Sequence, residues 1–104
     1  MSFVTLYSVF ADQAEAAQIG QLMVEERLAA CVNILGPCRS FYRWEGAIES
    51  ASEIPALFKT TTAQADALIA RITELHSYSL PAIALWPIER LGPGYGEWVE
   101  QNVR

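Results

Sequence analysis

Basic residues are scarce in this sequence. Its 104 residues include only seven Lys or Arg against twelve Asp or Glu, which gives a formal net charge of −5. Lys59 is the only lysine, and the arginines are scattered along the chain. Proteins that follow the phosphates of nucleic acids need clustered basic side chains. Nucleic-acid binding is therefore not expected.

Long apolar runs are also missing. No stretch of about 20 residues is apolar and free of charge, as a membrane-spanning helix requires. The first residues lack the basic start and the long apolar core of a signal peptide. We therefore expect a cytoplasmic protein without membrane association.

Cysteine occurs only twice. Cys31 and Cys38 are seven positions apart in a segment that is predicted to be extended, and such a segment spans roughly 23 Å. That is far beyond the reach of a disulfide, although a bend at Gly36 and Pro37 could shorten it. A cytoplasmic location also favours reduced thiols. Both cysteines are predicted to be free.

Familiar catalytic motifs are absent as well. The sequence has no G-x-S-x-G nucleophile elbow, no P-loop and no glycine-rich dinucleotide turn. Residues 8–12, at the end of the first predicted strand, also lack the glycine-rich phosphate loop ending in arginine that acylphosphatases carry. We predict that the protein is not an enzyme.

What remains has the composition of one folded domain over residues 1–104, with 52% hydrophobic and 18% charged residues. Asp12 with Glu15, and Thr61 with Gln64, resemble capping boxes that begin helices. Apolar residues then recur with helical spacing after each box. β-branched, aromatic and apolar runs predict strands over residues 3–10, 30–35, 39–48, 51–60 and 82–86, and a short helix is expected over residues 95–103.

The order of these elements is β-α-β-β-α-β followed by a small helix. This order predicts an α+β fold of the ferredoxin-like kind, in which a split βαβ arrangement forms one antiparallel sheet. Two helices are expected to cover one face of the sheet. The segment at residues 30–35 is interpreted as a buried strand.

The predicted strand over residues 39–48 carries aromatic residues on both faces. Phe41 and Tyr42 are adjacent, so their side chains point to opposite sides of a strand. One face can contact the helices of the same subunit, whereas the other would be left as an exposed apolar patch. Trp86 and Trp98 add to the aromatic content near the C-terminal end. We predict a cyclic homo-oligomer; a monomer with partly exposed aromatic rings is the alternative.

Two single residues could carry chemistry. His76 is the only histidine, and a neutral imidazole binds copper, zinc or nickel well. His76 is also at the predicted end of a helix, where it could instead donate a hydrogen bond to the free carbonyl groups. Lys59 precedes the second predicted helix and is either an anion contact or one half of a salt bridge.

Four separated segments resemble the CutA family, which is named for divalent-cation tolerance. They are residues 26–34, residues 42–46, residues 59–61 and the pattern His76-x-Tyr78-x-x-Pro81-x-Ile83. The segments occur in the order that the family has, and the resemblance extends over nearly the whole chain.

The resemblance implies a homotrimer of ferredoxin-like subunits, similar in architecture to PII signalling proteins, without a known enzymatic reaction. It implies a protein that responds to divalent metal ions, with copper as a possible ligand and His76 as the candidate metal ligand. It also implies clefts between subunits, lined here by Trp44, Lys59 and Tyr78. The alternative function is a PII-like module that holds a small anion or metabolite in those clefts.

The chain departs from the family pattern close to its histidine. Ser77 replaces the usual proline, Ser79 stands where an acidic residue is frequent, and Ala82 stands where glutamate is usual. Two possible carboxylate ligands near His76 are therefore missing. Tyr7 occupies a position where some family members have a cysteine.

Overall fold

The computed structural model describes residues 2–104 and contains five strands and three α-helices. In chain order these are β1 (Phe3–Phe10), α1 (Gln13–Glu25), β2 (Cys31–Ile34), β3 (Cys38–Trp44), β4 (Ala47–Thr61), α2 (Ala65–Leu75), β5 (Ile83–Ile88) and α3 (Tyr95–Asn102).

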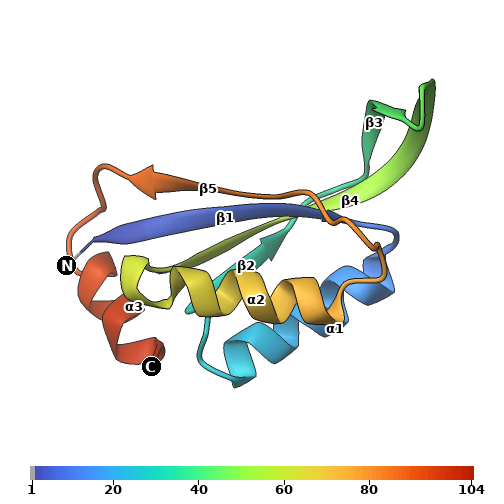
Figure 1. Cartoon of the computed structure of the whole chain (residues 1–104). Helices are drawn as coiled ribbons and strands as arrows, with labels where there is room; N and C mark the ends of the chain where they lie inside the picture. The colour runs from blue at the N-terminus through green and yellow to red at the C-terminus, as the bar shows by residue number, and fades with distance from the viewer. Residues whose placement is uncertain (1) are drawn as a thin grey trace.

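The sheet has the strand order β2-β4-β1-β5, and β3 pairs with β4 outside this path. Every pairing is antiparallel. If β2 and β3 are taken as one interrupted strand, this is the ferredoxin-like order, so the predicted fold is confirmed. Figure 1 shows α1, α2 and α3 on one side of the sheet, while residues 2–104 place no helix on the other side. The hairpin of β3 and β4 rises from one end, away from the helices.

The main core lies between the sheet and helices α1 and α2. From β1, the side chains of Leu6 and Phe10 are fully buried in it. Helix α1 contributes Ala16, Ile19 and Met23, and these positions have the helical spacing that predicted one apolar face. The core is thus built from alternate residues of strands and one stripe of each helix.

The first predicted helix cap is confirmed, and the second is wrong. The Asp12 carboxylate accepts a hydrogen bond from the Glu15 N–H at 2.8 Å. Residues Thr62–Gln64 instead form a 3₁₀ turn before α2, and the Thr61 hydroxyl forms no cap. The side chain of Gln64 donates to the main-chain oxygen of Arg104 at 3.0 Å. A contact with a distant part of the chain therefore replaces the local bond.

The interpretation of residues 30–35 as a buried strand is also wrong. Among the described strands, β2 is at the edge of the sheet and pairs only with β4. Val32 is half-buried, whereas Asn33 and Ile34 are exposed. The apolar composition suggested burial, but the position of a strand within a sheet is set by topology.

The hairpin projects as an arm, which we define as residues 38–52. Glu45 and Gly46 have φ angles of 49° and 83°, as a two-residue type I′ turn requires. Residues 54–61 of β4 pair with β1, and residues 47–53 of the same strand pair with β3. Residues 41–50 are all exposed. The expectation that one face of Phe41–Trp44 contacts the helices of the same subunit is therefore wrong.

Both cysteines are free, as predicted, and both are half-buried. Cys31 Sγ lies 3.4 Å from the hydroxyl of Tyr95, and Cys38 Sγ lies 3.7 Å from that of Ser40. Within residues 2–104, no helix is long and apolar enough to cross a membrane.

Candidate functional site

A cavity of about 630 Å³ lies where the arm leaves the body of the subunit. We call it the groove. It is lined by residues of β1, of both strands of the arm and of the segment that links α2 to β5. These are Tyr7, Val9, Ser40, Tyr42, Arg43, Trp44, Glu49, Glu53, Tyr78, Ser79, Leu80 and Ala82. Four of the twelve side chains are aromatic and three are charged.

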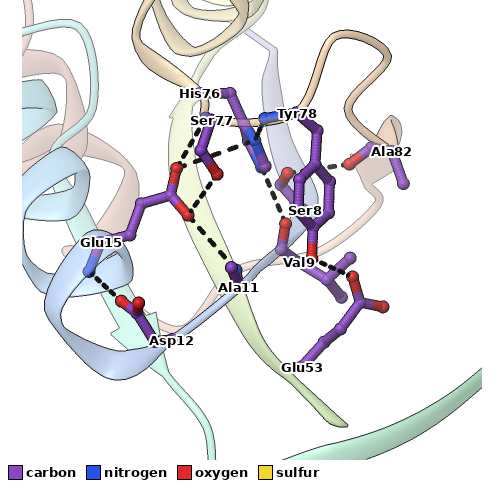
Figure 2. A network of polar contacts seen from close by, with 10 residues as sticks. All are labelled: Ser8, Val9, Ala11, Asp12, Glu15, Glu53, His76, Ser77, Tyr78 and Ala82. Atoms are coloured by element: carbon purple, nitrogen blue, oxygen red, sulfur yellow. Dashed lines mark hydrogen bonds and ion pairs between the residues drawn. The ribbon is translucent and has the colours of Figure 1, made fainter. Parts of the chain in front are cut away.

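A buried carboxylate lies in the groove wall at the base of the arm. Glu53 is only 6% exposed, and its Oε2 accepts a hydrogen bond from the hydroxyl of Tyr78 at 2.7 Å (Figure 2). Burial raises the pKa of Tyr78 strongly, and the hydrogen bond to Glu53 raises it further. Burial also raises the pKa of Tyr7, with smaller contributions from Cys38 and Glu53. Both phenols are therefore held in the neutral form.

His76 lies in the core behind Tyr78, and its side chain has no exposed surface. Its Nε2 is 2.8 Å from the main-chain oxygen of Val9, which can only accept, so Nε2 carries the proton. Its Nδ1 accepts the N–H of Tyr78 at 3.1 Å. The ring stacks on Phe10 with 4.8 Å between the centroids. Both nitrogens of the neutral imidazole are thus engaged (Figure 2).

Glu15 fixes the chain beside this histidine. Its carboxylate accepts the N–H of Ser77 at 2.7 Å and the hydroxyl of Ser77 at 3.0 Å. It also accepts the N–H of Ala11 at 3.3 Å, and it lies 3.9 Å from Nδ1 of His76. Figure 2 shows how these bonds join the start of α1 to the end of α2. A proline at position 77 could not donate the first of them, because it has no N–H.

The structure brings together two of the four residues predicted for a site. Trp44 and Tyr78 line the groove. Lys59 does not; its Nζ donates to Oδ1 of Asn33 in the neighbouring strand β2. His76 lies behind the groove rather than in its lining.

Sequence reasoning missed Glu53, the buried carboxylate of the groove. Its neighbours in the sequence gave no hint, because its partner Tyr78 is 25 positions further along the chain. Among residues 2–104, no group of three or more His, Cys, Asp or Glu side chains is arranged to hold a metal ion.

Replacing Tyr78 by Phe is expected to lower the free energy of unfolding by about 1–3 kcal/mol at pH 7, because a buried carboxylate loses its donor. The raised pKa of Tyr78 means that its contribution is complete below about pH 10, the ordinary pKa of tyrosine. It is lost as the pH rises further. The difference between wild type and Y78F should therefore shrink above pH 10 in urea unfolding followed by circular dichroism.

Y95F is the matched control for this experiment. Burial and the contact with Cys31 raise the pKa of Tyr95 to about 12. The contribution of Tyr95 to the stability of the fold is therefore also lost at high pH. Tyr95 contacts Cys31 and Trp98 rather than Glu53, however, so its replacement leaves that carboxylate with its donor. A constant difference between wild type and Y78F from pH 7 to pH 11 would contradict the role assigned to the Tyr78 hydroxyl.

Comparison with known proteins gives one consistent family. A family model described as CutA1 divalent ion tolerance protein matches residues 4–102. The divalent-cation tolerance protein CutA of Thermus thermophilus is 39% identical over 102 residues, which cover 98% of each chain. The protein of the same name from Archaeoglobus fulgidus is 38% identical over 89 residues, or 86% of each chain.

Solved structures agree with these sequences. CutA from Xylella fastidiosa superposes with a TM-score of 0.96 at 35% identity, over the whole of both chains. A structure described as the periplasmic divalent cation tolerance protein CutA from Archaeoglobus fulgidus has a TM-score of 0.94 at 34% identity. It covers 98% of this chain and 99% of its own.

Proposed function

Since the chain belongs to the CutA1 family of divalent ion tolerance proteins, we propose that it supports tolerance of divalent cations without catalysing a reaction. The observation that carries this proposal is the match along nearly the whole chain to relatives that are named for tolerance rather than for a reaction. Copper is the divalent cation that we propose to test first.

The test is growth of a bacterium that lacks its own CutA relative, at rising copper concentrations. Expression of this chain is expected to restore growth at concentrations that stop cells with an empty vector. The matched control is a strain that expresses the same chain at an equal level but is challenged with NaCl of the same ionic strength. Equal copper sensitivity with and without the protein would overturn the proposal.

We also propose a homotrimer as the working form. The arm supports this, because Phe41 and Ile48 are each 69% exposed on a hairpin that projects from its own subunit. The two side chains lie on the same face of the arm, since Phe41 is opposite Ser50 and Ile48 is opposite Arg43. Exposed apolar surface of this kind marks an interaction site. In a ring of three copies, each arm would lie against the next subunit.

Direct metal binding by His76 stays a prediction. It would require the loss of one of the two hydrogen bonds that the imidazole ring forms. A metal ion at Nδ1 would displace the N–H of Tyr78, and a metal ion at Nε2 would displace the oxygen of Val9. Either event opens the core at Phe10. A role of His76 as a metal ligand therefore requires this part of the core to rearrange.

The location proposed from the sequence is the cytoplasm. The relative from Archaeoglobus fulgidus whose structure superposes well is described as periplasmic. Fractionation of the source cells, with the protein detected by antibody, distinguishes these two compartments.

The groove favours a second function, the binding of a small metabolite, as in the PII-like alternative. Its volume of about 630 Å³ is in the range of small-molecule sites, which run from roughly 300 to 1,000 Å³. It also combines aromatic walls with a few polar groups, as such sites do.

A further inference from the structure

The groove contains a buried carboxylate, Glu53, that forms no ion pair among the residues that the structure describes. Glu53 is 6% exposed, and Tyr78 donates one hydrogen bond to it. A buried charge is costly unless it is paired. The groove is therefore a place where a cation would gain free energy from Glu53.

Aromatic rings surround the same space. Tyr7 comes from β1, Tyr42 and Trp44 come from β3, and Tyr78 follows α2. The π-electrons of such rings attract cations, and tryptophan does so most strongly. Rings together with a carboxylate form the usual recognition chemistry for ammonium groups that carry an organic substituent.

The charges that line the groove exclude an anion as the preferred ligand. Glu49 and Glu53 carry two negative charges and Arg43 one positive charge, which leaves one negative charge. Lys59, the residue that the sequence suggested as an anion contact, does not line the groove. An anion would therefore meet net repulsion from a wall that already holds a buried carboxylate.

The lining does not favour a metal ion either. Glu49 and Glu53 are its only carboxylates, and it contains no His or Cys. Divalent metal ions take four or more ligands, with oxygen preferred by the hard ions and nitrogen or sulfur by copper and zinc. The apolar part of the wall, which includes Val9, Trp44 and Leu80, instead matches a ligand with an apolar body.

Two small side chains leave room for that body. Ser79 and Ala82 line the groove at positions where a longer acidic side chain would fill it and would add negative charge. Ala82 is also held in place, because its main-chain oxygen accepts the hydroxyl of Ser8 at 2.8 Å (Figure 2). The space and the single buried carboxylate together match one positive charge attached to an apolar group.

We propose that the groove binds a small organic ammonium ion, with its charge beside Glu53 and its apolar part against Tyr42 and Trp44. This proposal rests on metabolite binding at the groove, the second function proposed above, and it names the chemical class of the metabolite. It is independent of copper tolerance. In a trimer the arm is also the interaction site, but Tyr42 and Trp44 lie on the opposite face of β3 from Phe41.

The experiment compares two probes of similar shape and opposite charge, 2-phenylethylammonium and 3-phenylpropionate. Binding is measured by isothermal titration calorimetry and by the change in tryptophan fluorescence. The wild type is expected to bind the ammonium ion at least tenfold more tightly than the carboxylate. Equal affinity, tighter binding of the carboxylate, or no binding of either probe would overturn the proposal.

Three variants test the residues assigned. E53Q keeps an oxygen that can accept from Tyr78 but removes the charge, and it is expected to weaken ammonium binding at least tenfold. E97Q changes an exposed glutamate in the first turn of α3 and should bind as wild type does. W44L alters a half-exposed side chain of the arm and should fold normally, with several-fold weaker binding. Wild-type affinity in both E53Q and W44L would refute the assignment.

The outcomes separate this inference from the functions on which it rests. If nucleotides or carboxylates stabilise the protein in a thermal-shift screen and the ammonium ion does not, metabolite binding stands and the ligand class is wrong. If nothing binds, both fail, while the copper growth assay still decides tolerance independently.

Discussion

Replacing Phe41 and Ile48 together by Ser is expected to convert the proposed trimer into a monomer of 11.5 kDa. Burying one such side chain contributes about 1.5–3 kcal/mol. The double change therefore removes roughly 3–6 kcal/mol from each interface, which weakens association more than 100-fold. Light scattering coupled to size-exclusion chromatography at micromolar concentration measures the mass directly.

The control for this experiment is Val24→Ser. Val24 is 38% exposed on α1, away from the arm, so its replacement removes exposed apolar surface of another element. This variant should elute as wild type does. A wild type that is already monomeric at micromolar concentration would refute the trimer, and an unchanged mass in the double variant would refute the role of these two side chains.

Replacing His76 by Ala is expected to lower the free energy of unfolding by about 3–5 kcal/mol. The substitution leaves a cavity beside Phe10, removes the donor to the buried oxygen of Val9 and frees the N–H of Tyr78. Chemical denaturation at one fixed protein concentration measures the loss, since the stability of an oligomer depends on concentration.

His76→Gln is the conservative partner of that variant. Its amide can still donate one hydrogen bond and accept another, so it should recover part of the lost stability. Titration of copper into folded wild type and H76Q then tests the metal role. Equal, weak binding by both would eliminate His76 as a ligand, whereas copper binding that is lost in H76Q would confirm the prediction made from the sequence. A loss of stability below about 1 kcal/mol in H76A would contradict the packing described here.

The features of the fold that the sequence predicted correctly depend on residues that are close together in the sequence. The Asp12 cap is correct because its partner is three positions away. The cap at Thr61 is wrong because Gln64 donates to Arg104, 40 positions away. In the same way, the burial of β2 depends on which strands lie beside it. Local patterns therefore fixed the order of the elements but not their surroundings.

The candidate site was likewise predicted only in part. Trp44 and Tyr78 were identified through the family resemblance, and both line the groove. Glu53 was not identified, because its burial and its bond to Tyr78 exist only after the arm and the segment behind α2 come together. Lys59 was expected in the same cleft, but pairing of β2 with β4 gives it Asn33 as a partner.

The groove and the arm meet at the point where β4 changes its pairing partner. Ile54 is the last residue that pairs with β1, and Glu53 is the first that pairs with β3. Any rotation of the arm relative to the body therefore moves the Glu53 carboxylate relative to Tyr78. The proposed ligand at Glu53 and a neighbouring subunit that holds the arm would therefore both restrict the same motion. By thermodynamic reciprocity, each then changes the affinity of the other by the same factor, so the affinity of the groove for its ligand would depend on protein concentration.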